Sequence, residues 1–164
     1  MLIAVVADTH IPKRAKRLPA ALLEGLRGAE LILHCGDWSA MEAYRALSAI
    51  APVHGVAGNT DGPELVKEFG WRKVVEAGGL RFGIVHGHAG KERTTPDRAY
   101  GAFADDPPDV IVFGHSHIPF LARRGGALLF NPGSPTDKRR QSRYSFGLIS
   151  ALDGRAEARH VYFE

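Results

Sequence analysis

The sequence is poor in cysteine and in long apolar runs. Cys35 is the only cysteine among 164 residues, which excludes a disulfide framework and a cysteine-based zinc knuckle and fits a reducing compartment. The apolar run over residues 2–7 ends at Asp8, has no basic segment before it, and is too short for a signal sequence or a membrane span. We therefore expect a cytoplasmic protein that does not contact a membrane.

The excess of positive over negative charge is also small. Lys and Arg number 21 against 18 Asp and Glu, for a formal net charge of +3. A dedicated nucleic-acid binder usually carries a stronger basic stripe, so that class is not indicated, although an anionic substrate is compatible. Two short basic clusters, at residues 13–17 and 138–143, are predicted to flank the mouth of a site if their loops share one rim, with solvated surface as the ordinary alternative.

What the chain does contain is an ordinary globular composition, with 45% apolar and 24% charged residues, which predicts one domain over residues 1–164. Buried strands alternate with helices at first, and hairpins dominate later. Strands are expected at residues 2–7, 31–35, 53–57, 73–77, 80–85, 109–113, 118–122, 127–130, 144–151 and 155–163.

Local patterns predict where three of the helices begin. Ser39 and Glu42 have capping-box spacing, and Asp61 stands before Gly-Pro-Glu as a helix N-cap would. Thr95 followed by Pro96 predicts a cap and a first helical residue for a short helix that ends before Pro107 and Pro108.

Five strand-like runs end in side chains that can bind a metal ion. Because ligands bind beyond the carboxyl ends of parallel strands, these side chains can converge on one rim of a sheet. Gly114 permits a sharp turn, so that the two histidines after it can point to different ions. The residues are Asp8 with His10, Asp37, Asn59, His86 with His88, and His115 with His117.

The chemistry of this set predicts two hard or borderline cations. Carboxylate, imidazole and amide ligands without a thiolate favour Mn²⁺, Fe, Zn²⁺ or Ni²⁺ over a structural zinc site. One ion rarely takes so many protein ligands and keeps room for a substrate, whereas two ions can share them across a bridging carboxylate. Such two-metal sites hydrolyse phosphate esters. We take manganese as the first candidate, with nickel, zinc, iron or magnesium as alternatives.

In order and spacing, the motifs resemble the signature of the calcineurin-like metallophosphoesterases. The motifs are Asp8-x-His10, Gly36-Asp37, Gly58-Asn59-x-Asp61, His86-Gly87-His88 and Gly114-His115-Ser116-His117. The length and the turn at Asn131-Pro132-Gly133-Ser134 look most like the small prokaryotic phosphodiesterase branch, whose relatives include a eukaryotic retromer subunit. The resemblance implies an α/β fold in which two mixed β-sheets pack as a sandwich with flanking helices.

The resemblance also implies roles for the residues. Asp8, His10 and His117 would hold the first metal, Asn59, His86 and His115 the second, and Asp37 would bridge them. The implied reaction is hydrolysis of a phosphate diester by a hydroxide held between the metals, without a covalent enzyme intermediate, on a small-molecule or nucleotide substrate. A nucleic-acid substrate is weakly supported, and a homo-oligomer is compatible.

The sequence departs from the family pattern at Thr60, where many members have a histidine that protonates the leaving group. A threonine hydroxyl is a poor acid near neutral pH. We hypothesise that His88 or metal-bound water partly substitutes, with a structural role as the alternative for His88. The candidate catalytic residues are Asp37, Asn59 and His88.

Two other functional classes compete with the phosphodiesterase. A non-catalytic metal-binding interaction module of the same fold is the main alternative, and the intact ligand set argues against it. A serine hydrolase is a distant third, because the sequence around Ser116 lacks the final glycine of a G-x-S-x-G elbow.

Overall fold

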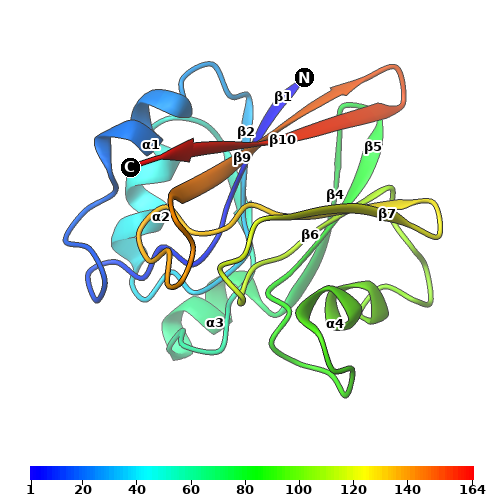
Figure 1. The fold of residues 1–164 in the computed structure, drawn as a ribbon, viewed down its shortest axis with the longest axis horizontal. Coiled ribbons are helices and arrows are strands. Elements are labelled where there is room, and N and C mark those ends of the chain that lie inside the picture. The colour runs from blue at the N-terminus through cyan, green and yellow to red at the C-terminus, as the bar shows by residue number, and fades with distance from the viewer.

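The structure, a computed structural model, describes residues 1–164 and contains two five-stranded mixed sheets packed face to face (Figure 1). In the first sheet the order is β10-β9-β1-β2-β3. Strands β1, β2 and β3 run parallel, and β9 pairs antiparallel with both β1 and β10. The bounds are β1 Leu2–Val6, β2 Leu31–His34, β3 Val53–Gly55, β9 Tyr144–Leu152 and β10 Arg155–Phe163.

The second sheet has the order β4-β5-β6-β8-β7. Strands β5, β6 and β8 are parallel, and the two edge strands β4 and β7 form antiparallel hairpins with β5 and β8. The bounds are β4 Arg72–Ala77, β5 Leu80–Val85, β6 Val110–Val112, β7 Phe120–Arg124 and β8 Ala127–Asn131. The predicted change from β-α units to hairpins coincides with the start of the second sheet at β4, but the later hairpin of β9 and β10 belongs to the first sheet.

Hydrophobic side chains fill three layers, one between the sheets and one under the helices on each outer face. The central cluster has 16 buried residues, with Val5 and Leu33 from the first sheet facing Phe82 and Phe130 from the second. Helices α1 (Ala20–Gly25), α2 (Met41–Ser48) and α3 (Pro63–Phe69) cover a second cluster on the first sheet, and α4 (Thr95–Gly101) covers a third on the other (Figure 1). The predicted two-sheet fold with flanking helices is confirmed.

The predicted helix starts at Ser39 and Asp61 are wrong. Helix α2 has Ala40 as its N-cap, and α3 has Gly62, and neither helix receives a side-chain cap. Ser39 lies in the left-handed region at φ 74°, which removes it from the extended geometry of an N-cap. The carboxylate of Asp61 is bound to other backbone amides, as described below.

The start of α4 was predicted one residue late. Thr94 is the N-cap, and its hydroxyl accepts a hydrogen bond from the amide of Asp97 at 3.2 Å. Gly78 and Gly79 form the tight turn between β4 and β5, with φ of 57° and 78°, as a two-residue hairpin requires. No helix of the chain is long and apolar enough to cross a membrane.

Candidate metal centre

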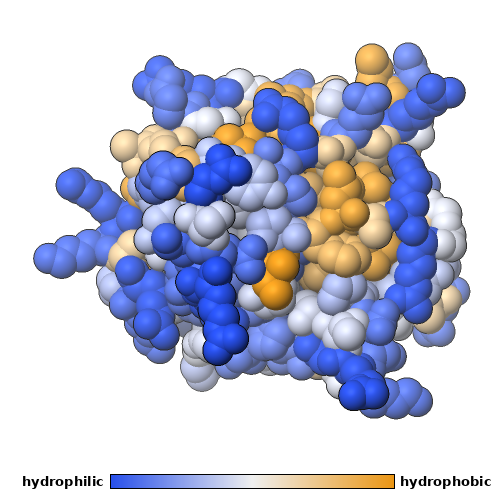
Figure 2. All heavy atoms as spheres, viewed as in Figure 1, coloured by the Kyte–Doolittle hydropathy of each residue, from blue (hydrophilic) through white to orange (hydrophobic).

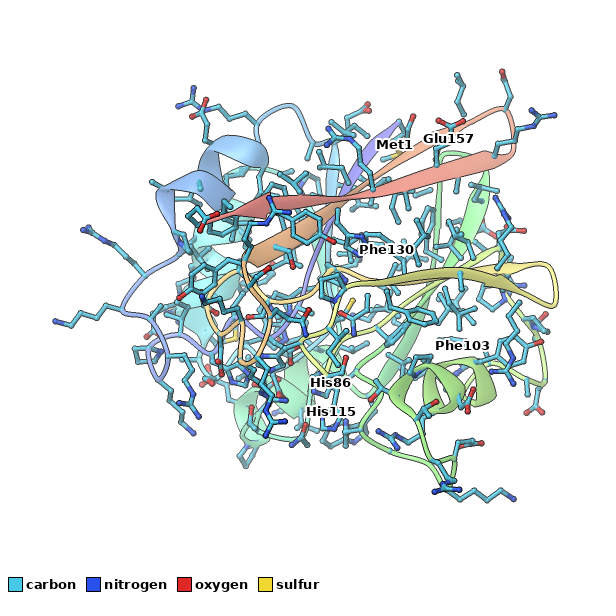
Figure 3. The ribbon with its side chains drawn as sticks, in the orientation of Figure 1. Met1, His86, Phe103, His115, Phe130 and Glu157 are labelled. Carbon is cyan, nitrogen blue, oxygen red and sulfur yellow. The ribbon has the colours of Figure 1, made fainter.

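The residues that follow β1, β2, β3, β5 and β6 meet at one end of the sandwich. Figure 3 shows His86 and His115 together at that end, with Met1 and Glu157 at the opposite end. The prediction that all the candidate ligands lie on the rim of one sheet is incomplete, because β1, β2 and β3 belong to one sheet and β5 and β6 to the other. The centre therefore lies across the seam between two sheets.

Asp8, His10 and His117 form a buried group. Their exposed fractions are 0%, 7% and 1%, and each offers one ligand atom within 4.8 Å of the others. Asp8 Oδ1 lies 3.9 Å from His10 Nε2 and 3.5 Å from His117 Nε2. We call these three residues the buried half of the centre.

The unpartnered atoms of this half fit a divalent cation. Asp8 Oδ1, His10 Nε2 and His117 Nε2 are buried and have no hydrogen-bond partner. A buried carboxylate oxygen and two ring nitrogens without partners are costly unless they share a positive centre. Oxygen and imidazole nitrogen also form a ligand set that Mn²⁺, Zn²⁺, Fe or Ni²⁺ accepts.

Asn59, His86 and His115 form the second group. Asn59 Oδ1 lies 3.1 Å from His86 Nε2 and 3.2 Å from His115 Nδ1. His86 is fully buried, whereas His115 is half-buried and Asn59 is exposed. We call these three residues the open half of the centre.

Asp37 lies between the two halves. Its Oδ2 is 3.7 Å from His10 Nε2 in the buried half and 3.2 Å from His86 Nε2 in the open half. Its Oδ1 accepts a hydrogen bond from the Thr60 amide at 3.0 Å, which fixes the carboxylate plane. A carboxylate that faces both groups of ligands has the position that a bridging ligand needs.

The backbone is strained at most of the candidate ligands. Asp8, His10, Asp37, His115 and His117 all have φ between 46° and 71°. Left-handed conformations cost a non-glycine residue about 1–2 kcal/mol each and persist where surrounding contacts enforce them. Such strain is typical of functional sites.

The role predicted for Gly114 is wrong in detail, because the left-handed turn is made by His115 and His117 themselves. Gly114 is needed for space instead: a Cβ there would stand 2.8 Å from Asp8 Oδ2 and from the Ala7 side chain. Asp8 Oδ2 also accepts the His115 amide at 3.0 Å, so the β1 and β6 loops are in direct contact.

Burial controls the protonation of the unpaired ligands. It raises the pKa of Asp8 to about 7 and lowers the pKa of His117 to about 4. Burial, with the charge of His86 beside it, also lowers the pKa of His115 to about 4. Neutral imidazole is the form that binds a metal, so these two rings are ready for one.

Asp37 and His86 behave as a pair. Burial disfavours both charges, but their mutual hydrogen bond and attraction hold the pKa of Asp37 well below its usual range. The same contacts, with the charge of Asp8, raise the pKa of His86 to about 9 against its burial. The proton on His86 thus lies where a bound cation would lie, and metal binding would release this proton.

Backbone carbonyls orient two of the imidazoles. His86 Nδ1 donates to the Cys35 carbonyl oxygen at 2.7 Å, and His117 Nδ1 donates to that of Asp137 at 2.5 Å. Each contact leaves Nε2 as the ring nitrogen that faces the other candidate ligands. Such partners fix the tautomer and the direction of metal-binding histidines.

Asp61 is a positioning residue that sequence reasoning placed in a helix cap. Its carboxylate accepts the amides of Asp37 at 2.9 Å and Gly58 at 2.8 Å through Oδ2, and that of Ser39 at 2.9 Å through Oδ1. These bonds tie the loop after β2 to the loop after β3. Asp61 therefore holds Asp37 and Asn59 in register.

The sequence indicates only a turn at residues 131–134, but in the structure the side chains of this segment support the centre. Asn131 Nδ2 donates to the Gly114 carbonyl at 3.0 Å, and Ser134 Oγ donates to the Asp8 carbonyl at 2.8 Å. Thr136 Oγ1 donates to the Thr9 carbonyl at 2.6 Å. A run of small polar residues after a buried strand was the available signal.

His88 lies beside the open half. Its ring centroid is 5.3 Å from that of His86 and 6.3 Å from that of His115, and the exposed Trp71 is 5.5 Å away. Its Nδ1 is buried without a partner. The loop that carries it is held by Arg98, which sequence reasoning missed and whose Nε donates to the Gly87 carbonyl at 2.8 Å.

This fold and this set of ligand side chains are those of a metallophosphoesterase. The family model of the calcineurin-like phosphoesterase superfamily domain matches residues 1–154, and the chain belongs to this family. A probable metallophosphoesterase of Methanothermobacter thermautotrophicus is 37% identical over 139 residues, which cover 83% of this chain and 78% of the relative.

Solved structures share the fold over the whole chain. Vps29 from Entamoeba histolytica, in complex with Zn²⁺, superposes with a TM-score of 0.78 at 24% identity and covers 100% of both chains. A structure described as a novel archaeal phosphodiesterase has a TM-score of 0.75 at 23% identity and covers 99% of this chain and 100% of its own. At this identity the likeness shows a common fold.

Proposed function

We propose that the protein is a metal-dependent phosphodiesterase with a dinuclear centre. Asp8, His10 and His117 would hold one divalent ion and Asn59, His86 and His115 the other, with Asp37 as the shared ligand. The observation that carries the proposal is the convergence of three buried, unpartnered ligand atoms beside a carboxylate that faces both groups. A structural core has no use for such an arrangement.

Two ions in this centre would acidify a water molecule and neutralise charge on the phosphoryl oxygens. The chain supplies the rest of the reaction. Asp61 and Thr60 keep Asp37 in one orientation through backbone amides. Asn59, the exposed ligand, would place its neutral amide beside the substrate, where a carboxylate would repel the phosphate.

His88 is the candidate proton donor to the leaving group, because Thr60 occupies the position of the usual histidine. Burial, and then the charge of His86, lower the pKa of His88. This makes His88 a weak reservoir of protons at neutral pH but a stronger acid when it is protonated. Its help should therefore matter most for poor leaving groups.

The donor set supports Mn²⁺ as the first candidate, with Ni²⁺, Zn²⁺, Fe or Mg²⁺ as alternatives. Zn²⁺ is favoured by one fact beyond the donor set, its presence in the Vps29 structure of the same fold. The proposed substrates are phosphodiesters of small molecules or nucleotides.

A binding module of the same fold is the second candidate function, supported by the likeness to Vps29. Exposed apolar side chains that a partner would cover include Ile118 at 50% and Leu121 at 46% exposure. The intact ligand set weighs against this candidate, because a module without a reaction does not need a second, solvent-facing group of ligands.

Hydrolysis of bis(p-nitrophenyl) phosphate after metal stripping tests the proposal. The stripped protein should be inactive and should recover activity with at least one of Mn²⁺, Ni²⁺, Zn²⁺ or Mg²⁺. Asp37→Asn should remain inactive with every metal. Absence of activity with all metals would leave the binding module as the better account. Full activity of Asp37→Asn would overturn the role of this centre in the reaction.

A further inference from the structure

A pocket of about 330 Å³ lies beside the loop that follows β6. Its lining includes Ser116, which stands in the chain between the candidate ligands His115 and His117. The pocket therefore borders the loop that carries these two candidate ligands. The remaining lining residues are Ile118, Lys138, Arg139, Arg140 and Gln141.

Two of the three cations in the pocket are available to bind an anion. Arg139 and Arg140 are exposed, and neither has a carboxylate within ion-pair distance. The ammonium of Lys138 lies 5.5 Å from the ring centre of Tyr144 and keeps its charge. The two arginines add guanidinium groups that no carboxylate of the chain neutralises.

Arg139 is fixed next to the centre. Its Nη1 donates to the His115 carbonyl at 3.3 Å, and its backbone is held in the left-handed region at φ 50°. The orientation of this side chain is thus set by the site itself.

The other basic cluster lies on the same rim. Arg14 Nε is 3.4 Å from Asp137 Oδ2, and the carbonyl of Asp137 accepts the ring of His117. Figure 2 shows strongly hydrophilic side chains over the loop after β1 and the loop before β9. Arg14 thus offsets the charge of Asp137, the acidic residue that precedes Lys138 in the chain.

We propose that this pocket binds a second, non-scissile phosphate of the substrate, so that the preferred substrates are nucleotide-like phosphodiesters that carry a further phosphate group. The inference rests on the proposed function. A guanidinium matches two oxygens of a phosphate in one plane, and paired arginines add charge-assisted hydrogen bonds. One bounded pocket and a net charge of +3 fit a small substrate better than a long nucleic acid, which needs a continuous basic track.

Two chromogenic substrates that differ by one phosphate test the pocket. Thymidine 5′-(p-nitrophenyl phosphate) has only the scissile phosphate, and its 3′-phosphorylated derivative adds a second. The wild-type protein should hydrolyse the derivative with a kcat/KM at least about tenfold higher, mainly through KM, because the added phosphate would accept charged hydrogen bonds from the arginines. Arg140→Glu should bring the ratio of the two kcat/KM values close to one.

Arg155→Glu is the matched control. Arg155 is an exposed residue of β10 that lines pockets at the opposite end of the sandwich. This variant should keep the wild-type ratio. Equal ratios in wild type and Arg140→Glu would overturn the inference, as would a steeply salt-dependent preference for oligonucleotides over both thymidine substrates.

Binding measurements separate this inference from the proposed function. If neither substrate is hydrolysed with any metal, the phosphodiesterase proposal fails, and calorimetric titration with thymidine 3′,5′-bisphosphate and thymidine 5′-monophosphate still tests the pocket. Binding of the bisphosphate at least about tenfold tighter, lost in Arg140→Glu, supports it. Equal affinities for the two nucleotides overturn it.

Discussion

The two halves of the centre use similar ligands in different surroundings. Asp8, His10 and His117 are closed off from solvent, and their free ligand atoms have no partner in the protein. In the open half, Asn59 is exposed and its amide oxygen already contacts both histidines. One half is thus incomplete without a cation, whereas the other is partly satisfied by itself.

This difference suggests a division of labour. An ion in the buried half would be retained, because desolvated ligands with no other partner gain most from it. An ion in the open half would face the solvent from which substrate arrives and would exchange more readily. The comparison predicts that the two halves respond differently to substitution, to pH and to leaving-group chemistry.

The largest effect is expected for Asp37→Asn, because Asp37 serves both halves. Hydrolysis of bis(p-nitrophenyl) phosphate should fall by more than about a hundredfold, since loss of a mere hydrogen-bond partner of a metal ligand already costs 10–100-fold. The control Asp153→Asn changes an exposed acid in the β9–β10 turn and should keep wild-type rates. Similar rates for the two variants would contradict a shared ligand.

The buried half should lower the stability of the metal-free protein at alkaline pH. The pKa of Asp8 is raised from 3.8 to about 7, so the folded state prefers the protonated form. Its stabilising contribution is complete below pH 3.8 and is lost as the pH rises through 7. At pH 8 in chelator, Asp8→Asn should therefore unfold at a higher urea concentration than wild type. Its free energy of unfolding should be higher by on the order of 4 kcal/mol, at about 1.4 kcal/mol per unit of pKa shift.

The difference between Asp8→Asn and wild type should shrink as the pH falls below 7. Asp105→Asn, an exposed acid, serves as the control and should show no such pH dependence. If Asp8→Asn is less stable than wild type at pH 8, the buried carboxylate of Asp8 does not destabilise the metal-free protein. Added metal should reverse the order of stability, because the variant lacks a ligand.

Asp61→Ala tests the link between the halves. Loss of three charge-assisted hydrogen bonds to the loops after β2 and β3 should lower the free energy of unfolding by about 2–3 kcal/mol. It should also reduce kcat by about 10–100-fold, because Asp37 and Asn59 lose their fixed positions. Asp61→Asn keeps one acceptor oxygen and should recover part of kcat. If Asp61→Ala lowers the stability and leaves kcat unchanged, Asp61 has no role in positioning the centre.

The smallest effect is expected at His88, on the open side. His88→Ala should slow hydrolysis of an unactivated diester more than that of bis(p-nitrophenyl) phosphate, whose leaving group needs no proton. The ratio of the two rates measures the effect directly. Equal small losses on both substrates would assign His88 a structural role.

Much of the centre could be predicted from the sequence because its ligands obey a local rule. Each candidate ligand lies one to five residues after the end of a strand, so Asp8, Asp37 and His115 need only the strand before them to be located. The two-sheet architecture came from the family resemblance, since strand patterns do not say which sheet a strand joins. The change from β-α units to hairpins located the start of the second sheet, but not the return of β9 and β10 to the first.

The supporting residues could not be predicted, because their roles depend on distant partners. The local sequence around Asp61 matches a helix cap. Its carboxylate instead accepts hydrogen bonds from the amides of two loops, one of which lies more than 20 residues away in the sequence. The left-handed turn fell on His115 and not on Gly114, because the Asp8 carboxylate holds the His115 amide. Such long-range hydrogen bonds leave no local signature.

The position of the centre across two sheets has a consequence for folding. Asp8 and Asp37 follow strands of the first sheet, whereas His86 and His115 follow strands of the second. A cation bound to both sets acts as a cross-link, so the two sheets cannot separate without releasing it. Metal should therefore slow amide hydrogen exchange in β1 and β6 together, and its concentration should set the melting temperature.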